Sequence, residues 1–224
     1  MNSQPFLLKR NLPFFAGLLL LLIAGSLLLS SIGKSAAFIS LNSYHPFWLN
    51  VFFINYTFMG DGIFALGLVV VYFLYFKKKQ QALALLYSFL ISGIVVQVIK
   101  NLVDAPRPKL FFEQGQYLYF MNGVSLSNNA SFPSGHTATA FAIATVIILF
   151  AKNKKWQLPV LIAAALVGYS RIYLAQHFLL DIIIGAFIGV SGGLVAYMLV
   201  KRNISFPRIS SKRPYRNNSH IAYG

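Results

Sequence analysis

The chain has 224 residues, of which 57% are hydrophobic and only 10% carry a charge. Because a soluble domain carries about 25% charged residues, this composition excludes an ordinary soluble protein and indicates a membrane protein. There is no cysteine, which excludes disulfides, thiolate catalysis and cysteine-held metals. The formal charge of +15 would suit nucleic-acid binding, but its distribution along the chain fits membrane topology and predicts no nucleic-acid partner.

Taken in order, long apolar runs predict an all-α, multi-pass membrane protein with six transmembrane helices in one bundle. The predicted spans are residues 14–32, 51–76, 82–103, 134–151, 158–174 and 178–199. The first run is longer than the roughly 7–15 apolar residues of a signal peptide, so we expect it to remain as a helix. Residues 33–50 read as a polar and aromatic connector, and residues 104–132 are the longest internal loop.

These runs leave no room for a separate soluble domain, so we predict one membrane domain over residues 14–200. Residues 1–13 would form a short cytoplasmic head. The tail, residues 201–224, is polar and basic, and we expect it to be disordered and attracted to anionic lipid.

Lysine and arginine residues are shared unevenly between the two sides of this predicted bundle. With the N-terminus in the cytoplasm, six spans return the C-terminus there, and 14 of the 19 basic residues fall on the cytoplasmic side. This positive-inside bias predicts cytoplasmic termini and a location in the plasma (inner) membrane. The five exceptions are Lys34, Lys100, Arg107, Lys109 and Arg171. Since topology does not explain these five, we expect another role for them.

The fourth predicted helix begins at the same outer face with Pro133-Ser134-Gly135-His136. Proline suits the first turn of a helix, and the first backbone N–H groups of a helix have no carbonyl partner of their own. With the positive end of the helix dipole, they form a seat for an anion such as phosphate. His136 stands at this seat, where its ring could give or take a proton.

Cations and a histidine–carboxylate pair fall at this face as well. Lys100 lies near the end of the third span, Arg107 follows seven residues later, and Arg171 lies near the end of the fifth span. Such cations can clamp several oxygens of one phosphate. His177 and Asp181 are four residues apart, a spacing that brings an imidazole and a carboxylate within hydrogen-bonding reach on a helix.

In combination, these motifs resemble the three-part signature of the type 2 phosphatidic acid phosphatase superfamily. That family includes bacterial membrane lipid phosphatases and shares its site with vanadium haloperoxidases. The matching residues run Lys100-x6-Arg107-Pro108, then Pro133-Ser134-Gly135-His136, then Ser170-Arg171-x5-His177-x3-Asp181. The resemblance covers roughly residues 95–189, and the membrane composition favours the lipid phosphatase branch over the soluble haloperoxidases.

The resemblance implies a mechanism in which His177 attacks phosphorus and forms a phosphohistidine. Asp181 would hold the other ring nitrogen of His177, while His136 would protonate the leaving oxygen and then activate water. No metal or other cofactor is implied, because cations and a backbone donor would stabilise the phosphate. The implied phosphate-binding residues are Lys100, Arg107, Ser134, Gly135 and Arg171.

We therefore predict a hydrolase, a metal-independent phosphatase of lipid phosphates or diphosphates with its site at the periplasmic or outer face. Its partners would be the lipid phosphate and the surrounding membrane lipids. A phosphotransferase between lipids would use the same site, and an anion transporter would also gather cations at a membrane face. The resemblance implies substrates such as undecaprenyl diphosphate, phosphatidylglycerol phosphate, phosphatidate and lipid A phosphates. The motifs contact phosphate and distinguish neither among these substrates nor among oligomeric states.

Asp61 lies inside the second predicted span, between two glycines. An acidic residue within a membrane span is costly and functional by default. Two interpretations stay open: a supporting or leaving-group role at the site, or a helix break near the outer side.

Small residues recur at four-residue spacing after the two histidines, which predicts close contacts between helices. They are Gly185, Gly189 and Gly193 after Asp181, and Ala140 and Ala144 after His136. The aromatic residues of the long loop suit an interfacial segment that guides a lipid headgroup, or an ordinary aromatic belt. They include Phe111, Phe112, Tyr117, Tyr119 and Phe120.

Overall fold

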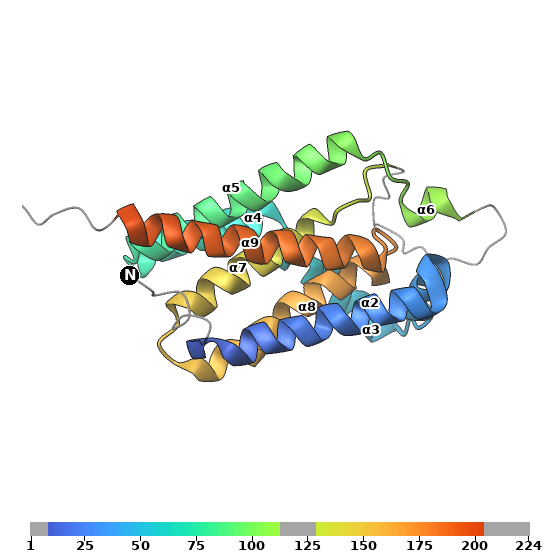
Figure 1. Cartoon of the computed structure of the whole chain (residues 1–224), viewed down its shortest axis with the longest axis horizontal. Helices are drawn as coiled ribbons and strands as arrows, with labels where there is room; N and C mark the ends of the chain where they lie inside the picture. Colours follow the sequence, from blue (N-terminus) through green and yellow to red (C-terminus); the bar gives the residue numbers. More distant parts are fainter. Residues whose placement is uncertain (1–8, 113–128, 204–224) are drawn as a thin grey trace, which may run out of the picture.

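The computed structural model describes residues 9–112 and 129–203, and every regular element in those two ranges is helical (Figure 1). The longer helices are α2 (Leu12–Leu41), α3 (Phe47–Tyr56), α4 (Gly62–Val70), α5 (Lys79–Leu102), α7 (Gly135–Phe150), α8 (Gln157–Tyr173) and α9 (Leu179–Asn203). The short elements are η1 (Thr57–Gly60), η2 (Val71–Tyr75), α6 (Pro108–Phe111) and η3 (Lys154–Trp156). The all-α prediction is confirmed for these residues. The predicted roles of the N-terminal head and the basic tail lie mostly outside the described residues.

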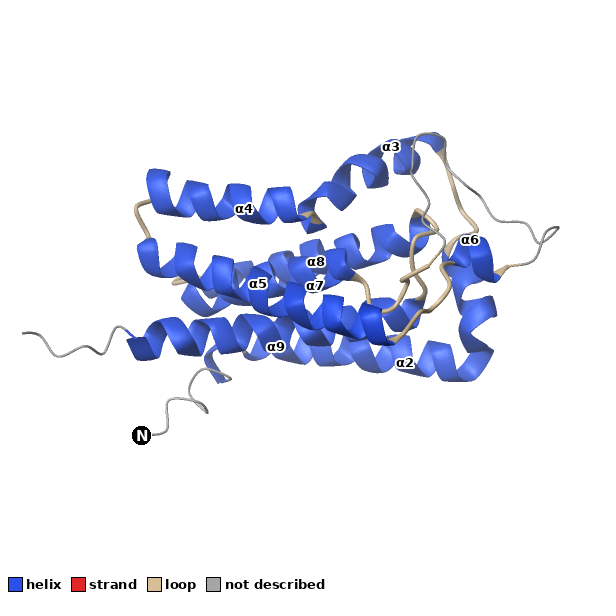
Figure 2. Ribbon diagram, turned by 90° about the horizontal axis from the view of Figure 1, so that it is seen from above, coloured by secondary structure: helices blue, strands red, loops and turns tan. Residues whose placement is uncertain are grey.

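The long helices alternate in direction along one bundle (Figures 1 and 2). One end holds the connections from α2 to α3, from α5 to α7 and from α8 to α9. The other end holds the α4–α5 and α7–α8 connections, together with the first residues of α2 and the last residues of α9. Contacts agree with this arrangement, since Arg10 donates to the carbonyl of Ala151 and the Gln157 side chain accepts from the Phe14 N–H. The first and last described residues of the chain thus lie at the same end of the bundle.

Three helices, α2, α5 and α9, are long and apolar enough to cross a membrane. The segments Phe47–Gly60 and Gly62–Tyr75 add a fourth span if they are taken together, and α7 is a shorter apolar helix. These helices support a membrane protein. The count of six spans and the cytoplasmic side of the termini remain predictions.

The first helix is longer than predicted. Residues 34–41, expected to belong to a connector, continue α2 beyond a kink at Gly33, whose φ of 79° is open to glycine. The extension stays helical because it buries apolar side chains. Phe38 is fully buried, and its ring packs against those of Phe112 and Phe178, with centroids 5.4 Å away in each case.

The predicted interruption of the second span is confirmed at Asp61. The two halves are bent by 60° there. Asp61 is the N-cap of α4, and its carboxylate accepts from the Ile63 N–H at 2.8 Å, which satisfies one of the open donors of the new helix. Asp61 is therefore a helix break, and its place next to the site is described below.

Helix α7 is the buried centre of the bundle and packs against α5, α8 and α9. Its contact with α9 is the most extensive, and the glycines of α9, which were predicted to allow close contacts between helices, lie at this contact. A Cβ added at Gly189 would overlap the Ala138 backbone, and Gly185 and Gly193 lie similarly close to α7. These three glycines thus let α9 approach α7 more closely than any larger residue would.

The two alanines of that prediction, Ala140 and Ala144, do not lie against the glycines of α9. Ala140 and Ala144 do follow His136 along one face of α7, but they line an apolar space beside Met59 and Val167. The residue against Gly189 is instead Ala138, which lies on the face that begins at Ser134. At 3.6 residues per turn, these two sets of α7 residues point in different directions.

Candidate active site

His177 and Asp181 form a buried pair at the start of α9. The Nδ1 atom of His177 lies 3.4 Å from Oδ2 of Asp181, and the two side chains are only 3% and 5% exposed. The same oxygen accepts from the hydroxyl of Ser131 at 2.5 Å and from the Phe178 N–H at 2.9 Å. Asp181 thus reaches back to the first residues of α9, as the acid of a capping box does, and holds the histidine as well.

Burial decides the charge of His177, which lies in the α8–α9 connection. It lowers the pKa of His177 from the ordinary 6.5 to about 4, even though the hydrogen bond to Asp181 acts in the opposite direction. The ring is therefore neutral at physiological pH. With its Nδ1 hydrogen directed to Asp181, the lone pair lies on Nε2, the atom that can attack.

A tight turn joins His177 to Arg171. The N–H groups of Gln176 and His177 both donate to the Arg171 carbonyl, at 2.9 and 3.2 Å, and the Ala175 N–H donates to Ile172. This is a Schellman ending of α8, in which Ala175 takes the left-handed position with φ of 52°. The turn thus sets how far the histidine lies from the arginine.

Two arginines from different elements have their side chains near this turn. Arg171 is buried; its Nη1 donates to the Thr57 hydroxyl at 2.7 Å, while its Nε has no hydrogen-bond partner among the described residues. Arg107, just after α5, donates to the Gln176 side chain at 2.6 Å and to the carbonyl of Asn129 at 3.1 Å. A buried guanidinium N–H without a partner needs an acceptor, and a phosphate oxygen is a suitable one.

The start of α7 supplies neutral donors. Ser134 is the N-cap, and its hydroxyl oxygen accepts from the Thr137 N–H at 3.4 Å and from the Thr137 hydroxyl at 2.8 Å. Its own hydroxyl hydrogen can then be donated to a ligand. The Ser134 N–H donates to the Asp181 carbonyl at 3.0 Å, which fixes α7 against α9. The N–H groups of Gly135 and His136 have no acceptor within the helix and can bind an anion.

His136 lies opposite Asp61. Its Nε2 is 3.9 Å from Oδ2 of Asp61, and the two side chains are 31% and 38% exposed. The approach depends on Gly60, since a Cβ there would lie only 2.8 Å from the His136 carbonyl oxygen. The structure therefore shows the helix break at Asp61 and places its carboxylate beside His136, while the supporting role stays a prediction.

The remaining cation, Lys100, is partly buried near the end of α5. Arg107, Arg171 and Asp181 lie close enough for their charges to act on Lys100, and Lys100, Arg107 and Arg171 lie close enough to act on His136. The structure therefore gathers every predicted site residue at one end of the bundle. They are Asp61, Lys100, Arg107, Ser134, Gly135, His136, Arg171, His177 and Asp181.

Three neutral residues of the site were not found from the sequence: Ser131, Thr57 and Gln176. Each holds a charged residue, and none belongs to a charged or periodic pattern. For Ser131 alone there was a signal, because it lies three residues before the N-cap of α7 in an irregular, polar stretch.

The other outer cations and the aromatic loop have different surroundings. The Lys34 ammonium lies over the rings of Phe178 and Phe111, 3.9 and 4.5 Å from their centroids. Phe112 is buried against Phe178 and packs on the bundle, whereas Phe111 remains 38% exposed. The predicted roles of Tyr117, Tyr119 and Phe120 lie outside the described residues.

Within the described ranges, no three His, Asp or Glu side chains group to hold a metal.

Comparison with known proteins assigns this geometry to a family. The sequence model of the PAP2 superfamily matches residues 81–205, a range that includes both histidines and all three cations. The chain belongs to the PAP2 superfamily. This confirms the family that the three motifs predicted.

Several relatives of this PAP2 chain are lipid phosphatases by name. It is 30% identical to phosphatidylglycerophosphatase B of Bacillus subtilis over 69% of its own length and 74% of that protein. Among solved structures, Aquifex aeolicus LpxE matches with a TM-score of 0.66 and 28% identity, over 74% of this chain and 94% of that one. A transmembrane PAP2-type phosphatidylglycerolphosphate phosphatase from Bacillus subtilis matches with a TM-score of 0.57 and 26% identity, over 87% and 98%. The predicted enzyme class, a hydrolase of membrane lipid phosphates, agrees with these relatives.

Proposed function

We propose that this PAP2 chain is a metal-independent lipid phosphate phosphatase that works through a phosphohistidine. One observation carries the proposal: the His177–Asp181 pair is joined by a closed turn to Arg171, whose buried Nε has no partner within residues 9–112 and 129–203. A neutral nucleophile, its orienting carboxylate and an open cationic donor are the parts that phosphoryl transfer to an enzyme needs.

In the first step, Nε2 of His177 attacks phosphorus, and a nitrogen–phosphorus bond forms as the bond to the lipid oxygen breaks. Asp181 stabilises the positive charge that develops on the His177 ring. His136 gives its proton to the departing oxygen, so the lipid leaves as a neutral alcohol, or as a lipid phosphate if a diphosphate is cleaved. The enzyme then carries the phosphoryl group on His177.

In the second step, a water molecule attacks phosphorus from the side that the lipid has left. His136, now neutral, takes a proton from that water, and the nitrogen–phosphorus bond breaks to release inorganic phosphate. Asp61, 3.9 Å from the ring, stabilises the imidazolium that His136 becomes. We therefore assign Asp61 a supporting role.

The remaining residues bind the phosphate oxygens that do not react. Arg171 and Arg107 offer guanidinium hydrogens, Lys100 adds a point charge, and Ser134 and the Gly135 N–H add neutral donors. Preorganised donors of this kind stabilise the charge that spreads over the oxygens in the transition state. Together they can supply the charge stabilisation that a metal provides in other phosphatases.

We further propose that the site faces the periplasm or the cell exterior. The site lies at the end of the bundle that carries Lys100 and Arg107, while the opposite end carries Lys77-Lys78-Lys79 and Lys152 to Lys155. The lysine-rich end is the one that the positive-inside rule assigns to the cytoplasm.

The test is phosphate release by the purified chain in detergent with EDTA and no acceptor lipid. Phosphatidylglycerol phosphate comes first, because the names of a sequence relative and of a similar solved structure refer to it. Undecaprenyl diphosphate, phosphatidate and lipid A phosphates follow. We expect release from at least one lipid, and an acid-labile phosphoenzyme that the His177→Ala variant does not form. A labelled protein that yields phosphate only when a second lipid is added would identify a phosphotransferase instead. A chain that releases no phosphate from any lipid would contradict the proposal.

A further inference from the structure

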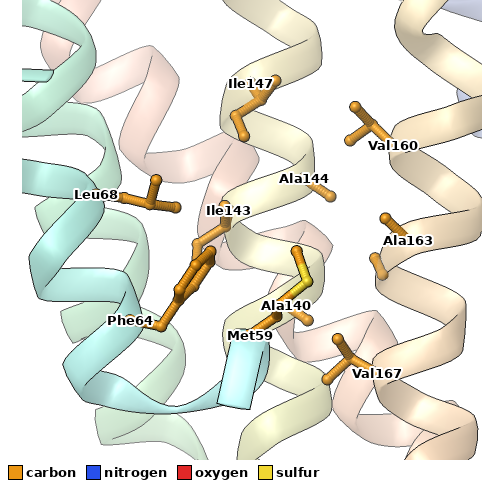
Figure 3. Close-up of a pocket in the computed structure, with 11 residues that line it drawn as sticks. Met59, Phe64, Leu68, Ala140, Ile143, Ala144, Ile147, Val160, Ala163 and Val167 are labelled. Atoms are coloured by element: carbon orange, nitrogen blue, oxygen red, sulfur yellow. The ribbon is translucent and has the colours of Figure 1, made fainter. Parts of the chain in front are cut away.

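An apolar groove lies directly beside the candidate site, deeper in the bundle. Its volume is about 190 Å³, and all its lining residues are apolar. Figure 3 shows side chains from three sides around this space, among them Phe64 from α4, Ile143 from α7 and Ala163 from α8. No polar group there would favour water or an ion.

The groove begins within about one helical turn of three site residues, although none of them lines it. On α7 its first lining residue is Ala140, one turn after His136. On the other two walls it begins at Met59, two residues before Asp61, and at Val167, one turn before Arg171. From Ala140 to Ile147 the groove follows α7 for about 10 Å, at 1.5 Å per residue.

The bend at Asp61 explains why this space is open. Beyond the bend, α4 packs on α5 and α7, while α8 packs on α7 and η1. Small side chains on the facing walls, including Ala144 and Ala163, leave the remaining volume unfilled. The residue that supports His136 thus also turns the chain so that a groove forms below His136.

We propose that this groove holds one hydrocarbon chain of the lipid whose phosphate binds at His177. The inference rests on the proposed function and deepens it. In an in-line reaction the departing oxygen lies opposite the nucleophile, on the side of His136, so the hydrocarbon attached to that oxygen must leave the site there. The groove starts on that side, and an apolar cavity of about 150 Å³ already binds a benzene-sized hydrocarbon. The groove thus takes a stretch of one chain and not two chains side by side.

A second apolar cavity, of about 300 Å³, provides the control. It lies between α2, α8 and α9 and is lined by Ala165 and Ile182, among others. Neither cavity has His136 or Asp61 in its lining, but this one lies on the His177 side, where Leu179 and Ile182 line it. Next to it, Phe38 and Phe178 pack with Ile172 in a buried cluster. Ala163 and Ala165 are therefore two residues apart on one helix and line different cavities.

The first experiment compares Ala163→Leu with Ala165→Leu. For each variant, kcat/KM is measured with a long-chain lipid phosphate and with a water-soluble aryl phosphate, and the ratio of the two values is taken. Because the added side chain displaces methylene groups of the substrate, we expect the ratio to fall about tenfold or more in Ala163→Leu. In Ala165→Leu it should keep the wild-type value. A ratio that falls in both variants, in neither, or only in Ala165→Leu would overturn the proposal.

The second experiment does not depend on the variants folding. The wild-type chain in lipid nanodiscs is irradiated with a long-chain alkylphosphonate that carries a diazirine about six carbons from phosphorus, close to the 10 Å length of the groove. We expect crosslinks on α4 and on the 140–147 segment of α7, reduced by excess unlabelled phosphonate. Crosslinks on α2 and α9, or labelling that the competitor does not reduce, would show another chain position or bulk lipid and refute the inference. If the wild type hydrolyses neither phosphate, the proposed function fails, while the crosslinks still report on the groove.

Discussion

Replacing Ser131 by alanine tests how the carboxylate behind the nucleophile is held. Ser131 is 1% exposed, and its hydroxyl gives Oδ2 of Asp181 the shortest of its three contacts, 2.5 Å against 2.9 Å from Phe178 and 3.4 Å from His177. A hydrogen bond to a charged group is worth about 1.5–3 kcal/mol. Since a factor of ten in rate corresponds to about 1.36 kcal/mol, phosphoenzyme formation should slow by about 10- to 150-fold.

The assay is the single-turnover rate of phosphohistidine formation, with thermal unfolding measured in parallel. Ser131→Thr, which keeps the hydroxyl, should retain most of the rate. The matched control is Ser88→Ala, because Ser88 is also fully buried but donates only to a carbonyl of its own helix. A Ser131→Ala variant within twofold of the wild-type rate would refute the reasoning, as would an equal loss in Ser88→Ala.

Three further predictions concern the two histidines and the packing of α7. Because the pKa of His177 is lowered to about 4, its neutral form is lost only as the pH falls through that value. With an activated aryl phosphate, whose leaving group needs no proton from His136, phosphoenzyme formation measured by rapid quench should therefore hold from neutral pH almost to pH 4. A loss centred near 6.5 would contradict this. His136→Ala should slow turnover by roughly 10²–10⁴ and accumulate phosphohistidine from an activated aryl phosphate, whereas label persisting in His177→Ala would reverse the two roles. Gly189→Ala should lower the free energy of unfolding by about 1–3 kcal/mol, because its Cβ meets the Ala138 backbone. Gly67→Ala, at an exposed position with no neighbour within 4 Å, is the control and should not lower the Tm.

Much of the fold follows from hydrophobic runs and glycines. The start of α7 at Gly135 and the break at Asp61 were predicted, because a proline-containing anion seat and an acid between glycines are strong local signals. The length of α2 was not predicted. Gly33 and the polar residues around it suggest a connector, and the helix continues only because Phe38 finds aromatic partners from distant segments.

The charged part of the site was predictable for a similar reason. Cations and carboxylates are rare in an apolar chain, so those on the outer side stand out, and their spacing matched a known signature. The residues that orient them do not stand out. Thr57 and Ser131 are neutral, common residue types, and they meet Arg171 and Asp181 across 114 and 50 residues of sequence. Only the packing of the helices brings them together.

The turn that closes on the Arg171 carbonyl has a consequence for an enzyme in a bilayer. Membrane helices tilt as the lipid thickness changes, and a site assembled from separate helices would change its dimensions with them. Here the backbone N–H of His177, the proposed nucleophile, donates at 3.2 Å to the carbonyl of Arg171, the residue that carries the buried guanidinium. If α8 tilts, we therefore expect the backbones of His177 and Arg171 to move together, so that the spacing between this ring and this cation depends little on the thickness of the membrane.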